Sequence, residues 1–99
     1  RIRKKCGEHF IVGIAVNDEP DIEVALQRES IAEIIAGHDK DHLLDYVTCG
    51  TGSYFDFHKL MPTFLYPERL GVDLAEVLKL AVSNALVIAE SHIRTPENA

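Results

Sequence analysis

Three apolar runs of strand length divide the chain, and each is followed by a polar or glycine-rich segment. The runs cover residues 10–16, 45–49 and 85–90. Each run is nearly continuous rather than alternating, which is typical of parallel strands that are covered on both faces. Helical patterns lie between the runs, so the sequence predicts an α/β fold with three parallel strands joined by right-handed crossovers.

The helices between the runs are marked by capping boxes. Ser30, with a glutamate three positions later, predicts the start of the first helix, and Gly37 predicts its end. An earlier start at Asp21 remains open. Asp73, again with a glutamate three positions later, predicts the start of the second helix. Residues 1–7 are expected to form the end of a further helix that a glycine closes.

Length and charge limit the function classes. A chain of 99 residues is expected to form a single domain with no internal boundary. Its formal net charge of −6 argues against nucleic acid or an anionic membrane surface as the main partner. No apolar window approaches the length of a membrane span. Cys6 and Cys49 form no Cys-x-x-Cys pair, which favours reduced thiols and a cytoplasmic location.

Ligands of α/β proteins bind at the carboxyl ends of the parallel strands. Function is therefore expected in the segments that follow the three runs, which are 17–20, 50–53 and 91–92. The second of these opens a long segment, 50–71, that holds most of the aromatic residues. A loop of that length inside a compact domain is usually functional.

Three groups of residues resemble one family. The pattern Arg-Ile-Arg-x-x-x-Gly-x-x-Phe-Ile-Val-Gly-Ile at 1–14 resembles the entry to the fifth strand of the old yellow enzyme family. Met-Pro-Thr at 61–63 and Pro67 resemble the loop after its sixth strand, and residues 87–99 resemble its seventh strand and phosphate loop. The nearest branch contains trimethylamine dehydrogenase, dienoyl-CoA reductase and bacterial N-demethylases of betaine-type substrates. The resemblance covers nearly the whole chain, and the order and spacing of the motifs carry it.

The resemblance implies a segment of a (β/α)8 TIM barrel that binds FMN. Such a barrel takes about 250 residues, so this chain would supply strands five to seven. The remainder of the barrel, or a homo-oligomer, would cover the open sheet edges. The parent would be an oxidoreductase that transfers hydride on a small substrate, which could be a methylated amine or betaine (by oxidative N-demethylation) or an enone. An iron–sulfur cluster in the parent would lie outside this segment, and the segment alone is expected to show no turnover.

The resemblance also assigns residues to the cofactor. Relatives hold the FMN phosphate after strand seven with an arginine, and here Ser91, His92 and Arg94 occupy that region. Ala15 stands where relatives carry an arginine directed at the flavin pyrimidine. Cys49 and Gly50 would lie beside the flavin face.

The long segment would form the substrate side. Tyr54 and Phe55 are expected to stack on the substrate, as an aromatic bowl does around a methylated cation. Asp56 and His58 are the candidates for acid–base catalysis. The alternative is that the aromatics pack beneath the loop and that the two polar residues are solvated.

Two further interpretations compete with this one. His38 and His42 have the spacing of a zinc pair on a helix, but they lack a glutamate partner at the required offset, so a solvated helix end is favoured. The chain could also be a self-standing α/β module that binds a ligand or partner without catalysis. A barrel of another chemistry would favour a Schiff-base lysine at a strand end, and the three runs have none there.

Overall fold

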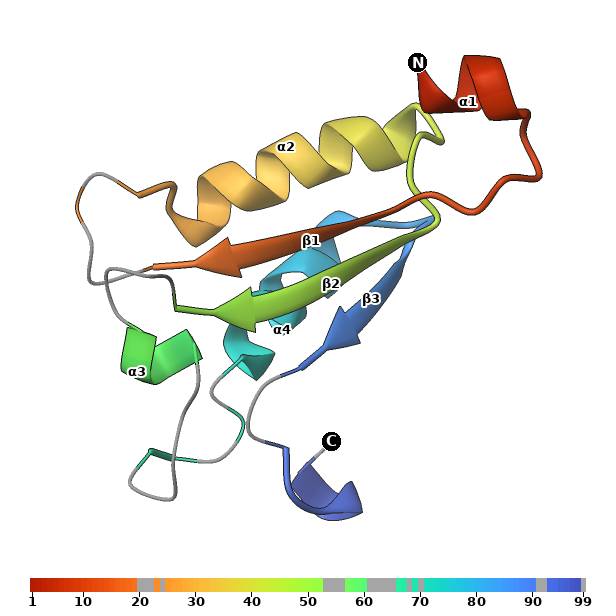
Figure 1. Ribbon diagram of the computed structural model, residues 1–99. Helices are drawn as coiled ribbons and strands as arrows, with labels where there is room; N and C mark the ends of the chain where they lie inside the picture. The colour runs from red at the N-terminus through yellow and green to blue at the C-terminus, as the bar shows by residue number, and fades with distance from the viewer. Residues whose placement is uncertain are drawn as a thin grey trace.

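The protein folds as three parallel strands and their connecting helices in the computed structural model (Figure 1). The structure describes residues 1–19, 23, 25–52, 57–60, 66, 67, 69, 71–90 and 93–98. Its elements are α1 (Ile2–Cys6), β1 (Gly13–Asp18), α2 (Arg28–Lys40), β2 (Tyr46–Thr51), α3 (Phe57–Leu60), α4 (Val72–Ala81), β3 (Leu86–Ala89) and the 3₁₀ helix η2 (Pro96–Asn98). The strands form one sheet in the order β1-β2-β3, and both pairings are parallel. The predicted α/β class with parallel strands is confirmed.

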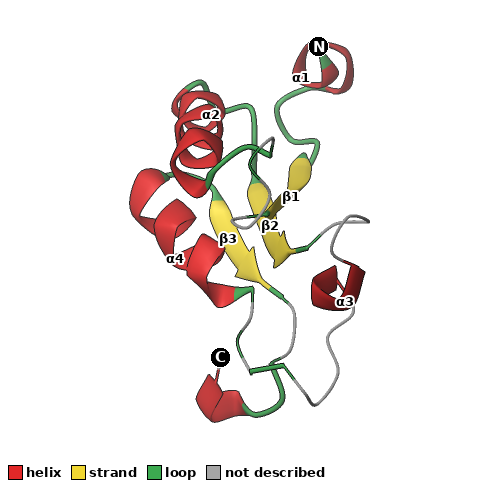
Figure 2. Ribbon diagram, turned by 90° about the vertical axis from the view of Figure 1, so that its left-hand side faces the viewer, coloured by secondary structure: helices red, strands yellow, loops and turns green. Residues whose placement is uncertain are grey.

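The long helices α2 and α4 lie on the same side of the sheet (Figure 2). The row Val16, Cys49 and Ala89 runs across the three strands and faces these helices. Successive side chains on a strand point to opposite faces, so this row fixes which residues belong to each face. The core between sheet and helices consists of Ile31, Ala32, Ile35, Val47, Cys49, Leu74, Ala75 and Leu78.

The second face of the sheet carries no long helix in the described part of the chain. We refer to it as the open face. Ala15 is exposed there, and Leu86 and Ile88 are 67% and 45% exposed. The continuous apolar runs predicted strands that are covered on both faces, and in the described part of the chain long helices cover one of them. The runs are apolar on both faces, but only one helical layer packs against them.

Strand β1 begins and ends later than the apolar run indicated. Phe10 and Ile11 precede the strand and are 52% and 72% exposed. Asn17 and Asp18, expected in a loop, continue the strand and pair with residues of β2. Polar residues can continue the strand because backbone pairing does not depend on side-chain polarity, and Arg28 provides an ion-pair partner for the buried Asp18 carboxylate.

Helix α2 is longer than its predicted bounds at both ends. It begins at Arg28 rather than Ser30, and no side chain caps it. It also continues through Gly37 to Lys40. A glycine inside a helix costs only about 1 kcal/mol relative to alanine, which packing readily offsets. The buried Asp39 near the helix end explains the extension, because its contacts hold the last turn in place.

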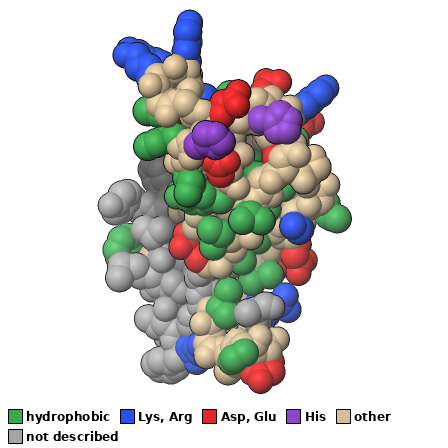
Figure 3. All heavy atoms as spheres, turned by 90° about the vertical axis from the view of Figure 1, so that its right-hand side faces the viewer, with side chains coloured by type: hydrophobic (Ala, Val, Ile, Leu, Met, Phe, Trp, Pro, Cys, Tyr) green, Lys and Arg blue, Asp and Glu red, His purple; other side chains and the backbone are tan. Residues whose placement is uncertain are grey.

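The amino end of the sheet is fastened by α1, whose cationic side chains project from that end of the molecule (Figure 3). Gly7 closes α1 at a φ of 87°, as predicted. Arg3 lies 2.8 Å from the Asp45 carboxylate and also donates to the carbonyl of Phe10. The same carboxylate accepts the Val12 N–H at 2.8 Å. This N–H, opposed by desolvation and aided by Arg3, lowers the pKa of Asp45.

Asp39 fastens α2 to the loop between α4 and β3. Its carboxylate accepts the backbone N–H groups of Ser83 at 2.9 Å, Asn84 at 3.2 Å and Ala85 at 2.6 Å. The residue is 2% exposed. Burial alone would raise the pKa of Asp39, but these three N–H groups outweigh burial and lower it. Asp39 is therefore a charged acceptor that sets the entry to β3.

Candidate functional site

Parallel strands end at the same edge of a sheet, so the residues after them meet there. At this edge Asn17 of β1 pairs with Gly50 of β2, and Glu90, the residue after β3, donates its backbone N–H to the Cys49 carbonyl at 3.1 Å. A Cβ placed on Gly50 would lie 3.0 Å from Asn17 Oδ1 and 3.7 Å from Glu90 Oε1. Asn17 Nδ2 donates to the Gly52 carbonyl at 3.0 Å, which fixes the amide with its oxygen toward Gly50. We call Asn17 Oδ1 and Glu90 Oε1 the acceptor pair.

Two further carboxylates lie beside the acceptor pair in the sequence. Asp18 is 1% exposed and is paired through Oδ2 with Arg28, which also lies 3.9 Å from the exposed Asp73. Asp18 Oδ1 has no hydrogen-bond partner. Glu19 is 6% exposed, and neither of its carboxylate oxygens has a partner. Buried acceptors without donors are uncommon in folded proteins and call for an explanation, such as a bound water or ion.

The charge at this edge influences a neighbouring thiol. Cys49 is fully buried in the core on the helix-covered face. Burial, followed by the charges of Asp18 and Glu90, raises the pKa of the Cys49 thiol to about 11. The edge is therefore negatively charged, and this cysteine is a thiol near neutral pH.

Next to the acceptor pair, the open face carries small side chains over β1 and β2. Ala15 and Thr48 form the row below, and Gly13 and Tyr46 form the row after that. A Cβ on Gly13 would fall 2.1 Å from the Tyr46 ring, so the glycine is needed for the ring to lie flat there. The small side chains lie over β1 and β2, whereas the exposed Ile88 and Leu86 of β3 stand beside them in the same two rows.

The small side chains of Ala15 and Thr48 would leave room for the flat ring system of FMN over β1 and β2. The acceptor pair also fits the one N–H group of the oxidised ring. None of the three strands contains a lysine or arginine, so the strands supply no cation for the negative charge of a reduced ring. Asn17 and Glu90 would hold the ring edge, and Ala15 and Gly50 would leave room for it.

The sequence-predicted site residues are only partly brought together. Ala15 and Gly50 share the carboxyl half of the open face, whereas the Cys49 side chain is on the opposite face. His58 is exposed on α3, with its ring centroid 5.4 Å from that of Tyr66. Arg94 is exposed after β3. The remaining candidates lie outside the described residues; they are Tyr54, Phe55, Asp56, Ser91 and His92.

Sequence reasoning missed both members of the acceptor pair. Asn17 was expected in a loop and Glu90 at the end of an apolar run, and neither was singled out. The available signal was a polar residue at the end of each outer strand, with a glycine at the matching position of the middle strand. The described residues contain no group of three or more metal-ligating side chains, and His38 instead contacts the Ile34 carbonyl through Nδ1 at 2.7 Å.

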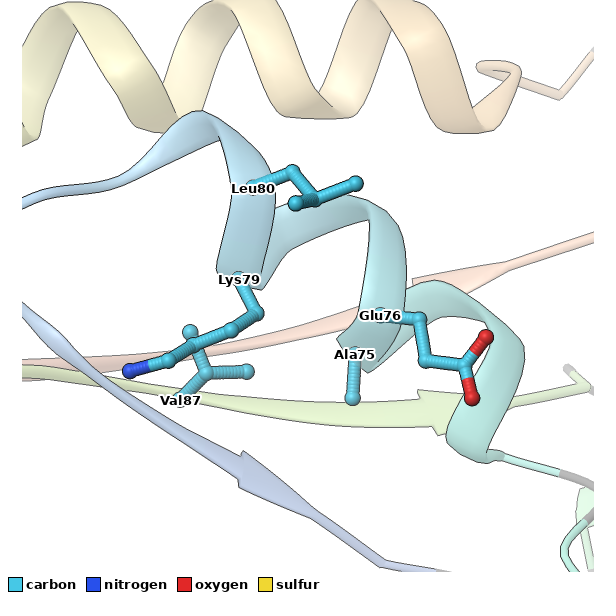
Figure 4. Close-up of a pocket in the computed structure, with 5 residues that line it drawn as sticks. All are labelled: Ala75, Glu76, Lys79, Leu80 and Val87. Atoms are coloured by element: carbon cyan, nitrogen blue, oxygen red, sulfur yellow. The ribbon is translucent and has the colours of Figure 1, made fainter.

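Each outer edge of the sheet carries an apolar hollow. One of about 470 Å³ lies between α4 and β3; Figure 4 shows Glu76 and Lys79 at its two ends, with Ala75 and Val87 between them. Leu80, which also lines it, is 91% exposed. The other, of about 120 Å³, lies between β1 and α2 and is lined by Ile14, Val16, Leu26, Ile31, Ile34 and Ile35.

No helix in the described part of the chain is long and apolar enough to cross a membrane. Comparison of the chain with protein-family models, with curated proteins and with solved structures found no match.

Proposed function

We propose that this chain forms strands five to seven of a (β/α)8 barrel of the old yellow enzyme type. On this proposal, the carboxyl edge of its sheet is one wall of an FMN-dependent oxidoreductase site. The substrate would be a small molecule, either a methylated amine or betaine or an enone. When bound, FMN would accept or donate the hydride. The residues of this chain would bind and orient the flavin and the substrate.

The observation that carries the proposal is the arrangement of the sheet. Three parallel strands follow in chain order, and their long helices lie on one side only. In a (β/α)8 barrel the helices form the outer ring and the other face of each strand faces the interior. The apolar open face and the apolar hollows at both outer edges are the surfaces that neighbouring β/α units would cover.

The polar groups are distributed as a barrel enzyme requires. Active sites of barrel enzymes are built at the carboxyl ends of the strands. Here Asn17 and Glu90 lie beside Gly50 at that end, and the small Ala15 and Thr48 form the adjacent row over β1 and β2. Ser91, His92 and Arg94 remain the proposed phosphate contacts, and Tyr54, Phe55, Asp56 and His58 the proposed substrate contacts.

The proposal is tested by titrating the 99-residue protein with FMN and recording flavin fluorescence and the visible spectrum. We expect quenching and a structured visible band, with no turnover. Gly50→Leu should abolish the signal because the new side chain occupies the floor. Leu80→Gln, on the outer surface of α4, is the control and should leave binding unchanged.

Circular dichroism of each variant separates lost binding from lost folding. If the folded wild-type protein leaves the FMN spectrum unchanged at millimolar concentration, the flavin proposal is wrong. The alternative of a non-catalytic ligand-binding module would then be favoured.

A further inference from the structure

We propose that a second copy of this chain binds along the outer edge formed by β3 and α4, so that two three-stranded sheets join into one. This does not rest on the proposed function, which places the next β/α unit of a barrel at the same edge. It states which partner covers that edge in the 99-residue protein.

The outer edge of β3 is open to strand pairing. In the described part of the chain, β3 is the last strand of the sheet. The backbone N–H groups of Leu86 and Glu90 donate to carbonyls on the β2 side. Backbone groups alternate in direction along a strand, so those of Val87 and Ala89 point to the outer edge. An edge of this kind is a template for pairing with another chain, and a second β3 can pair with it antiparallel about a two-fold axis beside Ile88.

The face of α4 next to this edge is complementary to itself. Four residues of α4 line the hollow beside β3, and they are Ala75, Glu76, Lys79 and Leu80 (Figure 4). When two α4 helices pack antiparallel, one register places Glu76 of each copy opposite Lys79 of the other. The same register places Ala75 opposite Leu80, because both pairs share one midpoint along the helix. Opposite charges therefore meet at both ends, and a small side chain meets a large one between them.

A neighbouring ion pair does not prevent this contact. Glu76 lies 3.5 Å from Arg69 of its own chain, and both side chains are exposed. Exposed ion pairs contribute little to stability. Glu76 can therefore also accept Lys79 of the second copy.

The strand contact and the helix contact fit one another in distance. Helix α4 packs against both β2 and β3, so its axis lies near the boundary between these strands. Neighbouring strands lie about 4.8 Å apart, so pairing the two β3 strands places the α4 axes about two strand spacings, or about 10 Å, from each other. Packed helices lie about 8–10 Å apart. A continuous sheet and a helix–helix contact can therefore form together.

The exposed apolar side chains at this edge provide the driving force. Leu80 is almost fully exposed, and it would enter the hollow of the second copy, which measures about 470 Å³. On the open face, strand pairing brings the exposed Ile88 of each copy beside that of the other. Apolar pairs across neighbouring strands stabilise a sheet, and burying apolar surface favours association.

Sedimentation equilibrium of the 99-residue protein tests the association. At about 0.1 mM we expect mostly dimer, with twice the chain mass of 11.0 kDa, which requires a dissociation constant of about 10 µM or lower. A protein that is still monomeric at about 1 mM would overturn the proposal. Assemblies that grow without limit would also overturn it, because they need head-to-tail contacts rather than a two-fold one.

Charge reversal at the two ends of the hollow locates the contact. Lys79→Glu places glutamates opposite one another and Glu76→Lys places lysines there, so at low salt each variant alone should dimerise at least about tenfold more weakly. A mixture of the two variants restores opposite charges at both ends and should form a heterodimer about as tight as the wild-type dimer. Lys4→Glu on α1 and Glu33→Lys on α2 make the same charge changes at exposed positions. These controls should dimerise as the wild type does.

The outcomes of the reversal experiment are distinct. If both reversal variants dimerise as tightly as the wild type, or if their mixture stays monomeric, the contact is wrongly assigned. Circular dichroism of each variant separates lost association from lost folding.

The FMN titration is independent of these measurements, because the pairing uses the side of β3 and leaves the carboxyl ends of the strands uncovered. A dimer that binds no flavin would refute the oxidoreductase proposal and leave this one standing. A monomer that binds flavin would do the reverse.

Discussion

Removing the charge of the buried Asp39 should destabilise the protein more than the same substitution at an exposed aspartate. In Asp39→Asn the side chain keeps its size and one acceptor oxygen, but it loses its negative charge. Its amide nitrogen would also face backbone N–H groups. The three donors affected belong to Ser83, Asn84 and Ala85, which lead directly into β3.

The magnitude follows from these bonds. A hydrogen bond to a charged group contributes about 1.5–3 kcal/mol and a neutral one about 0.5–1.5 kcal/mol, so each of the three bonds loses roughly 1 kcal/mol. The Ala85 bond is the most sensitive, because Ala85 is 5% exposed and water cannot replace the lost partner. We expect a loss of about 2–4 kcal/mol, a large part of the stability of a domain this size.

Urea denaturation followed by circular dichroism measures this loss. The midpoint should fall by roughly 1–2 M urea. Asp41→Asn is the matched control, because it makes the same change two residues later on an exposed side chain, and it should move the midpoint little.

The pH dependence gives a second test. The pKa of Asp39 is lower in the folded state than in the unfolded state. Its contribution is therefore fully present above the unfolded value of about 3.9, and it is lost as the pH falls toward the folded value. The difference in unfolding free energy between wild type and Asp39→Asn should shrink over that range. A variant as stable as Asp41→Asn, or a difference that does not change in acid, would refute the reasoning.

Two further predictions concern the open face and the core thiol. Gly13→Ala should lower the unfolding free energy by about 1–2 kcal/mol because the Tyr46 ring must move. Gly37→Ala places its methyl group where no other atom is near, so it should raise the unfolding free energy by about 0.5–1 kcal/mol. Equal effects of the two substitutions in urea denaturation would contradict the contact between Gly13 and Tyr46. Cys49, with its pKa raised to about 11 and its side chain buried, should react with a thiol reagent only on unfolding, whereas the exposed Cys6 should react at once. Rapid labelling of both thiols in the folded protein, measured by mass spectrometry, would show that the core is not as described.

The order and direction of the strands could be predicted from the sequence, whereas their exact bounds could not. Apolar runs separated by helical patterns are enough to indicate parallel pairing, and this was confirmed. The bounds of β1 depend on backbone pairing with β2, which carries Asn17 and Asp18 into the strand despite their polarity. The end of α2 depends on Asp39, whose partners lie more than forty positions away. No local pattern contains that information.

The candidate site was predictable in position but not in composition. The rule that ligands bind at the carboxyl ends of parallel strands indicated the edge where Gly50 lies. It did not identify Asn17 and Glu90, because their convergence depends on the register of three strands. It also did not show that Cys49 belongs to the other face, since that depends on the pairing of Cys49 with Val16 rather than with Ala15.

The carboxylates at the two edges of the sheet differ in whether their oxygens accept hydrogen bonds. At the amino edge, Asp39 and Asp45 each accept backbone N–H groups, and each has a lowered pKa. At the carboxyl edge, one oxygen of Asp18 and both oxygens of Glu19 are buried without a donor. Burying an acceptor without a partner costs free energy, whereas satisfying it stabilises the fold. Asp39 and Asp45 therefore contribute stability at the amino edge, whereas three carboxylate oxygens at the carboxyl edge have no donor among the described residues.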